Sequence, residues 1–182
     1  LEENPAEDRL LTNDLYGDGP SYRLSQEIVL GIGGVRMLRA LDYSDVQTFH
    51  MNEGHAALLG LELLTERLDE RGLQRPTQED ISAFRRQCVF TTHTPVPAGQ
   101  DRFSQELVAR SLGRRRTDLL EEMGAFAAGE LNMTDLALRS SHYVNGVGMK
   151  HGEVSTGMYP NYPISAISNG VHAATWVCAP MQ

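Results

Sequence analysis

Apolar residues follow two spacings along this chain, the three-to-four-residue repeat of amphipathic helices and the short continuous runs of buried strands. The first repeat predicts a helix at residues 21–41, capped by Ser21 and buried along Leu24, Ile28, Val35 and Leu38. The second predicts a helix at 54–71, ended by Gly72 and buried along Leu58, Leu61, Leu64 and Leu68. Thr77, followed three residues later by Asp80, predicts the capped start of a third helix.

Strand-like runs alternate with these helices. We expect strands at 46–50, 88–92, 142–145 and 164–168, and further helices at 104–112, 117–126, 134–140 and 150–158. The charged residues 1–15 indicate an irregular arm, and the prolines of 95–99 predict a stiff loop without regular structure. Strands separated by helices imply right-handed crossovers, so the sequence predicts an α/β fold, a Rossmann-like parallel sheet with flanking helices.

Composition narrows the class of protein. With 182 residues, 41% of them hydrophobic, the chain suits one soluble domain with its own core. Its net charge of -8 disfavours nucleic acid and anionic membranes as partners, and the basic run 114–116 is interpreted as a solvated helix face because acidic residues follow it. No apolar run reaches the length of a membrane span and no signal peptide is recognised, so we expect a cytoplasmic protein.

Cysteine and lysine are scarce, and each bears on chemistry. Cys88 and Cys178 lie in apolar contexts without metal-ligand spacing, which indicates buried free thiols in a reducing compartment. Lys150 is the only lysine, so chemistry through a Schiff base must use Lys150 or a lysine outside this chain.

Common catalytic and cofactor motifs are misplaced or missing. The run Gly31-Ile32-Gly33-Gly34 lies inside a helical pattern, so a close helix contact explains it better than a dinucleotide-binding loop. The histidines lack metal-ligand spacing, and no Gly-x-Ser-x-Gly sequence occurs. We therefore expect neither a zinc site nor a serine hydrolase.

Polar residues end four of the apolar runs, and parallel sheets bind ligands at the carboxyl ends of their strands. These residues are Glu53, His55, His93, Asn145 and Asn169. Taken singly, Glu53 suits a helix cap, His93 suits a structural loop, and the Asn-Gly pairs suit turns. Taken together, groups that donate and accept hydrogen bonds favour a cleft for a hydroxyl-rich ligand such as a sugar.

Longer blocks carry a more specific signal. They are LYGDGPSYRLSQEIVLGIGGVRMLRAL (15–41), FHMNEGHAALLGLELL (49–64), VFTTHTPVPAGQDRF (89–103), LNMTDLALRSSHYVNGV (131–147), KHGEVS (150–155) and ISNGVHAATW (167–176). In content and order these blocks resemble the α-glucan (glycogen, starch or maltodextrin) phosphorylases, especially their shorter bacterial branch.

The resemblance implies two Rossmann-like domains, a B-type glycosyltransferase architecture, with the active site between them. Such enzymes transfer a glucosyl unit from the non-reducing end of an α-1,4-glucan to phosphate, giving glucose 1-phosphate, and their cofactor is pyridoxal phosphate. By this resemblance His93 and Asn169 contact the sugar at the cleavage site, whereas Glu53 and His55 line the glucan side.

The chain also departs from the family. It shows no match to the C-terminal domain, which supplies the cofactor lysine, or to the opening of the N-terminal domain. We therefore expect residues 1–182 to be part of the N-terminal glucan-binding domain, without catalytic, cofactor-binding or metal-binding residues and inactive alone. Its partners would be glucan, phosphate and the remainder of the enzyme, and homo-oligomerisation is left open. Gln100 stands where bacterial relatives usually have histidine, which leaves the polar contacts of the proline loop undetermined.

Two other classes of protein remain open at this point. One is a non-catalytic carbohydrate-binding or scaffold half-domain. The other is a nucleotide-sugar glycosyltransferase of the same architecture, against which the HTPVPAG and SNGVH blocks argue.

Overall fold

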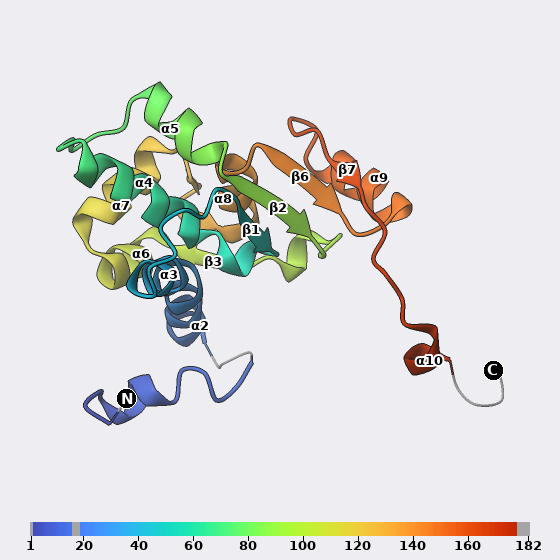
Figure 1. Ribbon diagram of the computed structural model, residues 1–182, viewed down its shortest axis with the longest axis horizontal. Helices are drawn as coiled ribbons and strands as arrows, with labels where there is room; N and C mark the ends of the chain where they lie inside the picture. Colours follow the sequence, from blue (N-terminus) through green and yellow to red (C-terminus); the bar gives the residue numbers. More distant parts are fainter. Residues whose placement is uncertain (1, 16–18, 178–182) are drawn as a thin grey trace.

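A four-stranded parallel sheet forms the centre of the molecule, which this computed structural model describes at residues 2–15 and 19–177 (Figure 1). The strands, in their spatial order, are β1 (Phe49–Asn52), β2 (Cys88–Thr92), β6 (Tyr143–Gly146) and β7 (Ser165–Ala166). All three pairings between neighbouring strands are parallel. The predicted α/β class with a parallel sheet and flanking helices is therefore confirmed.

Helices precede, connect and follow the strands, and most of them lie where the hydrophobic spacing predicts them. They are α1 (Ala6–Arg9), α2 (Pro20–Ile28), α3 (Gly34–Ala40), α4 (Leu58–Glu70), α5 (Gln78–Arg85), α6 (Gln105–Leu112), α7 (Arg114–Glu122), α8 (Met133–Ser140), α9 (Met149–Met158) and α10 (Ala173–Trp176). A π-helical segment (Val29–Gly33) joins α2 to α3, and 3-10 turns lie at Gly54–Ala56 and Pro97–Gly99. Among the described residues, no helix combines the length and apolar character needed to cross a membrane.

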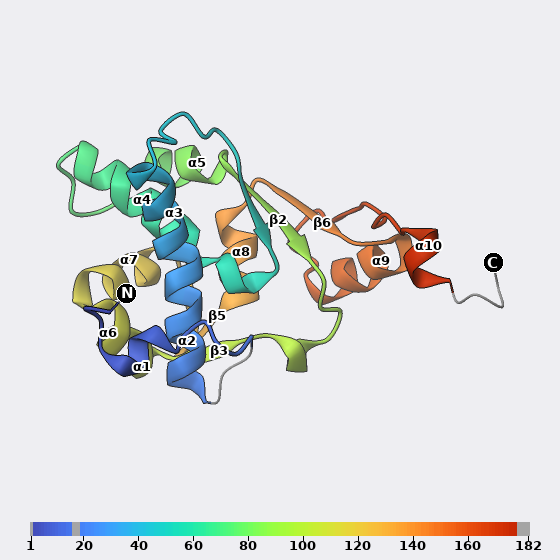
Figure 2. The ribbon, with the colours of Figure 1, turned by 60° about the horizontal axis from the view of Figure 1, so that its bottom comes forward.

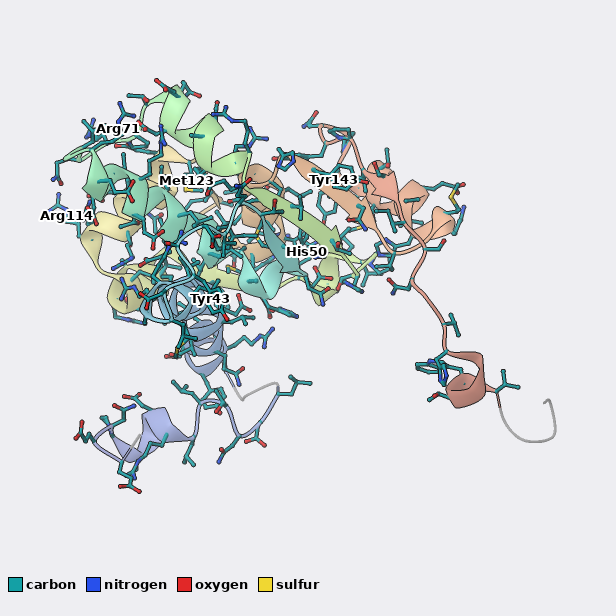
Figure 3. The ribbon with its side chains drawn as sticks, viewed as in Figure 1. Tyr43, His50, Arg71, Arg114, Met123 and Tyr143 are labelled. Carbon is teal, nitrogen blue, oxygen red and sulfur yellow. The ribbon has the colours of Figure 1, made fainter. Side chains whose placement is uncertain are left out.

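The helices and the open side of the sheet lie on opposite faces. Because the strands follow one another in chain order, right-handed crossovers place the connecting helices on one face. Phe49 and Met51 of β1 are buried on that face, whereas His50 and Asn52 point the other way and are exposed. Tyr143, which shares the face of His50, is 39% exposed (Figure 3). Within the described chain the sheet is covered by helices on one face only.

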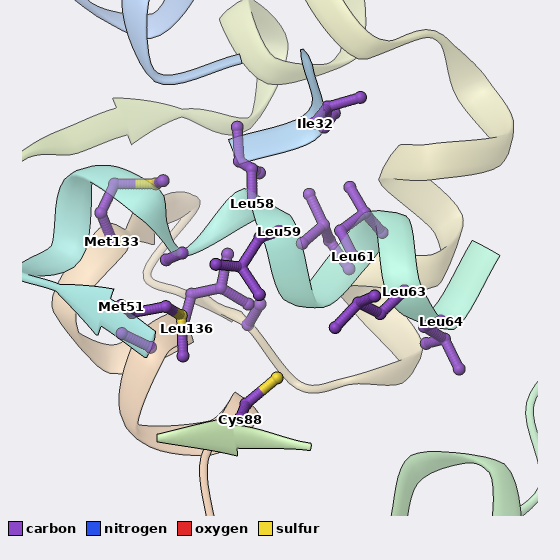
Figure 4. Packing of buried hydrophobic residues seen from close by; sticks show 14 of the residues in the cluster. Ile32, Met51, Leu58, Leu59, Leu61, Leu63, Leu64, Cys88, Met133 and Leu136 are labelled. Carbon is purple, nitrogen blue, oxygen red and sulfur yellow. The ribbon is translucent and has the colours of Figure 1, made fainter. Parts of the chain in front are cut away.

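The core lies between the sheet and α4, with α8 on the same side (Figure 4). Met51, Cys88 and Phe90 enter it from the strands and are fully buried. The predicted buried stripe of α4 is confirmed, because the four leucines predicted for it are fully buried: Leu58, Leu61, Leu64 and Leu68. Cys88 is a buried free thiol as expected, and Cys178 lies outside the described residues.

The predicted helix at 21–41 is one continuous rod that contains the unexpected π-helical segment (Figure 2). Leu24 and Val35 are buried on it, and Ile28 and Leu38 pack partly buried against the core. A Cβ at Gly31 would lie 2.8 Å from the backbone nitrogen of Leu59. The interpretation of the glycine run as a close helix contact is confirmed at Gly31.

Several boundaries differ from the sequence prediction. The first strand begins at Phe49 rather than at residue 46, because its partner β2 begins only at Cys88. The helix expected at 117–126 ends at Glu122, and the chain turns at Gly124, whose φ is 67°. The residues after this turn form part of a second, antiparallel sheet, which the sequence prediction missed. Its strands, in spatial order, are β3 (Arg102–Ser104), β5 (Glu130–Asn132) and β4 (Phe126–Ala127).

The sequence prediction needs correction at three further segments. The arm expected to be irregular contains the single turn α1, and the proline loop contains a 3-10 turn because the fixed φ of Pro97 suits the start of one. The last strand is shorter than 164–168 and ends at Ala166, where its partner β6 also ends, at Gly146. The capping box at Thr77 and Asp80 is present as predicted.

Candidate functional site

The carboxyl ends of the four strands lie side by side along one edge of the sheet. The register pairs Thr92 with Gly146, and Gly146 with Ala166. His93 follows β2 directly and is exposed. Asn169, also exposed, stays beside this edge because its backbone N–H donates to the carbonyl of Val147 at 3.1 Å. The structure thus brings His93 and Asn169 to the edge that the sequence pattern indicated.

Glu53 connects the end of β1 to the loop that follows β2. Its carboxylate accepts hydrogen bonds from the His93 N–H at 2.7 Å, the Thr94 hydroxyl at 3.0 Å and the Gly54 N–H at 3.1 Å. The last bond is the helix-capping role foreseen as the alternative for Glu53. Its carboxylate oxygens are therefore engaged by protein groups at the edge where a sugar contact was expected.

The backbone of Glu53 is held in a conformation that suits glycine. Its φ is 71° and its ψ is 170°. A side chain in this region costs about 1–3 kcal/mol and persists only where surrounding contacts compensate. The three hydrogen bonds to the carboxylate are such contacts.

His55 points into a partly buried cluster of charges instead of toward the strand ends. Its Nδ1 lies 3.1 Å from Oδ2 of Asp101 and 2.6 Å from Nη2 of Arg23. Arg23 Nη2 also donates to Asp101 at 3.0 Å, and Arg23 Nε lies 3.2 Å from Oε1 of Glu27. Glu27 is only 1% exposed. The cluster joins α2, the 3-10 turn before α4 and the residue before β3.

The charged groups of this cluster shift one another's ionisation. Burial raises the pKa of Glu27 to about 7. The hydrogen bond to Asp101, followed by that to Glu27, raises the pKa of His55 to about 9, against burial and Arg23. The pKa of Asp101 is lowered, because hydrogen bonds from His55 and Arg23 outweigh burial. The two carboxylates therefore favour the protonated form of His55, whereas burial and Arg23 disfavour it.

The same cluster is the one group among the described residues with the spacing of metal ligands. Glu27, His55 and Asp101 offer ligand atoms within 4.8 Å of one another. The guanidinium of Arg23 lies among these atoms and already supplies a cation. We assign the group as an ion-pair network.

The loop between β2 and β3 is also fixed through Gln100. Its side-chain carbonyl accepts from the Asn132 amide at 2.7 Å, and its amide donates to the hydroxyl of Tyr159. Glutamine at this position therefore maintains polar contacts for the proline loop, the point that the sequence left undetermined.

Asn145 does not occupy a turn, the role that its Asn-Gly pair suggests when taken alone. It lies within β6 and is 8% exposed. Its Oδ1 accepts from the hydroxyl of Thr91 at 2.9 Å, and that hydroxyl lies 2.7 Å from Nε2 of His50. These side chains form a polar row across three strands on the open face of the sheet.

Sequence reasoning missed several participants in these contacts, among them Arg23, Glu27, His50, Thr91 and Asp101. Glu27 carried a usable signal, because it follows the buried Leu24 by three residues and so falls on the inward side of its helix. Asp101 lies in the block 89–103 but carries no local pattern that marks its role.

Lys150 does not fit a cofactor site. It is exposed at the start of α9, where its Nζ pairs with Oε2 of Glu153 at 2.7 Å. This contact raises the lysine pKa, whereas a Schiff-base lysine needs its pKa lowered by burial or a neighbouring cation. Lys150 therefore does not fit the role of the lysine that binds pyridoxal phosphate.

Fold and edge together define an α/β protein with hydrogen-bonding groups at the carboxyl ends of parallel strands, the usual ligand position in such sheets. A scan against protein-family models finds no match. Glycogen phosphorylase from Mycobacterium tuberculosis is 40% identical over 202 residues, which cover 97% of this chain and 23% of that protein. Maltodextrin phosphorylase from Thermococcus litoralis is 36% identical over 190 residues, which cover 97% of this chain and 22% of that protein. Glycogen phosphorylase from Aquifex aeolicus is 30% identical over 197 residues, covering 100% and 28%.

The resemblance seen in the sequence is thus confirmed: the chain matches one segment of the glycogen and maltodextrin phosphorylases over nearly all of its residues. It spans about a quarter of the length of these curated relatives.

Proposed function

We propose that this chain is part of the N-terminal glucan-binding domain of an α-glucan phosphorylase with two-domain, B-type architecture that acts in the cytoplasm. The observation that carries the proposal is the strand-end edge, where His93 and Asn169 are both exposed and lie in blocks shared with the family. The identity to phosphorylases over 97% of the chain supports it.

In this proposal the polypeptide that contains the chain transfers a glucosyl unit from the non-reducing end of an α-1,4-glucan to phosphate. His93 and Asn169 hydrogen-bond the hydroxyls of that glucosyl unit, because imidazole and amide groups both donate and accept. Pyridoxal phosphate is held by residues outside this chain, since Lys150 is engaged by Glu153 and exposed. The chain then supplies one side of the sugar site.

The test is phosphorolysis by the full-length polypeptide. It is incubated with maltoheptaose and phosphate, and glucose 1-phosphate is measured, with sulfate replacing phosphate as a control. We expect phosphate-dependent product from the full-length protein and none from residues 1–182 alone, even with added pyridoxal phosphate. Absence of product from the full-length protein would overturn the proposed activity. Turnover by residues 1–182 alone would overturn the assignment of the chain as one part of the site.

A further inference from the structure

We propose that Glu53 is a positioning residue that fixes the start of the 93–101 loop, while Asp101 fixes its end. In this view Glu53 acts on the sugar through His93 and does not itself contact the glucan. The inference rests on the proposed sugar site for its effect on activity, but the loop contacts can be measured without any substrate.

The contacts of Glu53 carry the first half of the proposal. Its Oε2 accepts from both the His93 N–H at 2.7 Å and the Thr94 hydroxyl at 3.0 Å, and its Oε1 accepts from the Gly54 N–H at 3.1 Å. Both carboxylate oxygens are thus engaged by the protein. The Glu53 N–H also donates to the carbonyl of Thr91 at 2.9 Å, so main chain and side chain tie β1 to the end of β2.

The backbone of Glu53 strengthens this argument. Glycine would adopt a φ of 71° without strain, whereas glutamate is strained there. Comparing Glu53→Gly with Glu53→Gln therefore separates two effects, since only glycine relieves the strain and both variants remove the carboxylate. A residue that served only stability would respond to the first effect, and a positioning residue would respond to the second.

Asp101 is held independently at the other end of the loop. Its Oδ2 accepts from Arg23 Nη2 at 3.0 Å and lies 3.1 Å from His55 Nδ1. Its carbonyl accepts from the Met133 N–H at 3.1 Å. His55 therefore belongs to the anchor at the end of the loop, and Glu53 to the anchor at its start. His93 is the first anchored residue of the loop. Its backbone is fixed by Glu53, and its side chain is exposed.

The test compares Glu53→Gln and Glu53→Gly in the full-length polypeptide, with Glu106→Gln as matched control. Glu106 is an exposed carboxylate on α6 that pairs with Arg110. Hydrogen exchange of the His93 and Thr94 amides, thermal melting, and kcat and KM for maltoheptaose are measured for each variant.

We expect Glu53→Gly to exchange the His93 amide about tenfold faster or more, and to lower kcat by a similar factor with little change in KM. Glu53→Gln keeps one acceptor oxygen in its amide, so it should change both quantities in the same direction but by less. Glu53→Gly should melt no lower than Glu53→Gln, and Glu106→Gln should match the wild type. Asp101→Ala should speed exchange at residues 100–102 and leave the His93 amide protected.

Unchanged exchange at His93 would overturn the proposal, and unchanged exchange with a raised KM would assign Glu53 to direct glucan binding. Loss of protection throughout β1 and β2 would also overturn it, because the role would then be general stability. If the full-length protein shows no phosphorolysis, the proposed function fails, but the exchange at His93 still decides whether the anchor exists.

Discussion

At the scale of single residues, His93 and Asn169 differ from Glu53 in what they leave available to a ligand. The side chains of both are exposed at the carboxyl edge, whereas the carboxylate of Glu53 is engaged by three protein donors. His55 is engaged as well, through Asp101 and Arg23. In the proposed function, direct sugar contacts therefore fall to His93 and Asn169, and we propose supporting roles for Glu53 and His55.

Substitution of either exposed residue by alanine in the full-length polypeptide should impair catalysis more than folding. A sugar hydrogen bond made mainly in the transition state contributes about 1–3 kcal/mol, so His93→Ala and Asn169→Ala should each lower kcat/KM roughly ten- to hundredfold. His142→Ala and Asn161→Ala serve as matched controls, because both residues are exposed and His142 lies at the amino end of β6, the opposite edge.

Steady-state kinetics and thermal melting of the four variants check this expectation. Wild-type kcat/KM in both edge variants, with the folded state retained, would show that these two are ordinary loop residues.

At the scale of elements, a close helix contact is the crossing of the π-helical segment over the start of α4. A Cβ on Gly31 would meet backbone atoms of Leu58 and Leu59 at 3.0 and 2.8 Å, whereas one on Gly34 would meet nothing within 4 Å. Backbone cannot move aside as a flexible side chain can, so the two glycines make a matched pair.

Gly31→Ala should destabilise the protein by about 1–3 kcal/mol through overpacking. Gly34→Ala should stabilise it by roughly 0.5–1 kcal/mol, because alanine loses less backbone entropy in a helix. Urea unfolding of both variants measures the difference. Equal effects of the two substitutions would mean that the rod does not press on α4 as described.

The charge network between α2, the 3-10 turn before α4 and the proline loop predicts that stability depends on pH. Glu27 faces Arg23, His55 and Asp101, and its pKa is raised from 4.5 to about 7. Between these values the folded protein binds more protons than the unfolded chain, so stability falls as pH rises. His55, raised from 6.5 to about 9, contributes fully below 6.5 and loses its contribution as pH rises toward 9. Asp101, whose pKa is lowered, contributes throughout this interval.

Glu27→Gln should therefore remove most of the fall in stability between pH 4.5 and 7, which is roughly 2 kcal/mol. The fall in stability above pH 7, which comes from His55, should remain. Thermal melting at closely spaced pH values provides the profile, with Glu106→Gln as a control of unchanged shape. If the profiles of Glu27→Gln and the wild type ran parallel, Glu27 would not titrate in this interval.

Features set by neighbours in sequence could be predicted, and features set by distant segments could not. The capping box of Thr77 needs only the residue three positions on, and the stripe of α4 needs only its own spacing. The start of β1 depends on β2, and the second sheet gathers strands of two or three residues from separate parts of the chain. At the site, the polar ends of the apolar runs predicted the positions of His93 and Asn169. The contact of Arg23 with Asp101 could not be predicted, because the two residues lie 78 positions apart in the sequence.

At the scale of the whole molecule, one face of the parallel sheet is open within the described residues. Parallel sheets occur almost only with both faces covered. Here His50 and Asn52 are exposed on the open face, and β1 pairs with β2 alone among the described strands. The rod of α2 and α3 adds exposed apolar side chains, with Met37 60% and Leu30 56% exposed. Surfaces of this kind bind further polypeptide.

Residues 1–182 expressed alone should therefore associate with one another as concentration rises. Sedimentation at several concentrations, with a dye that reports exposed apolar surface, measures this. A dye-silent monomer at every concentration would show that the chain closes its own surfaces, and a stand-alone scaffold role would then gain over a part of a larger enzyme.

The central claim is that one edge of this sheet binds the terminal glucosyl unit of an α-glucan. A crystal structure of the full-length polypeptide with a maltooligosaccharide and phosphate tests it most directly. We predict the terminal sugar within hydrogen-bonding distance of His93 and Asn169, with Glu53 still bound to the His93 N–H. A sugar bound with neither His93 nor Asn169 in reach would contradict the account.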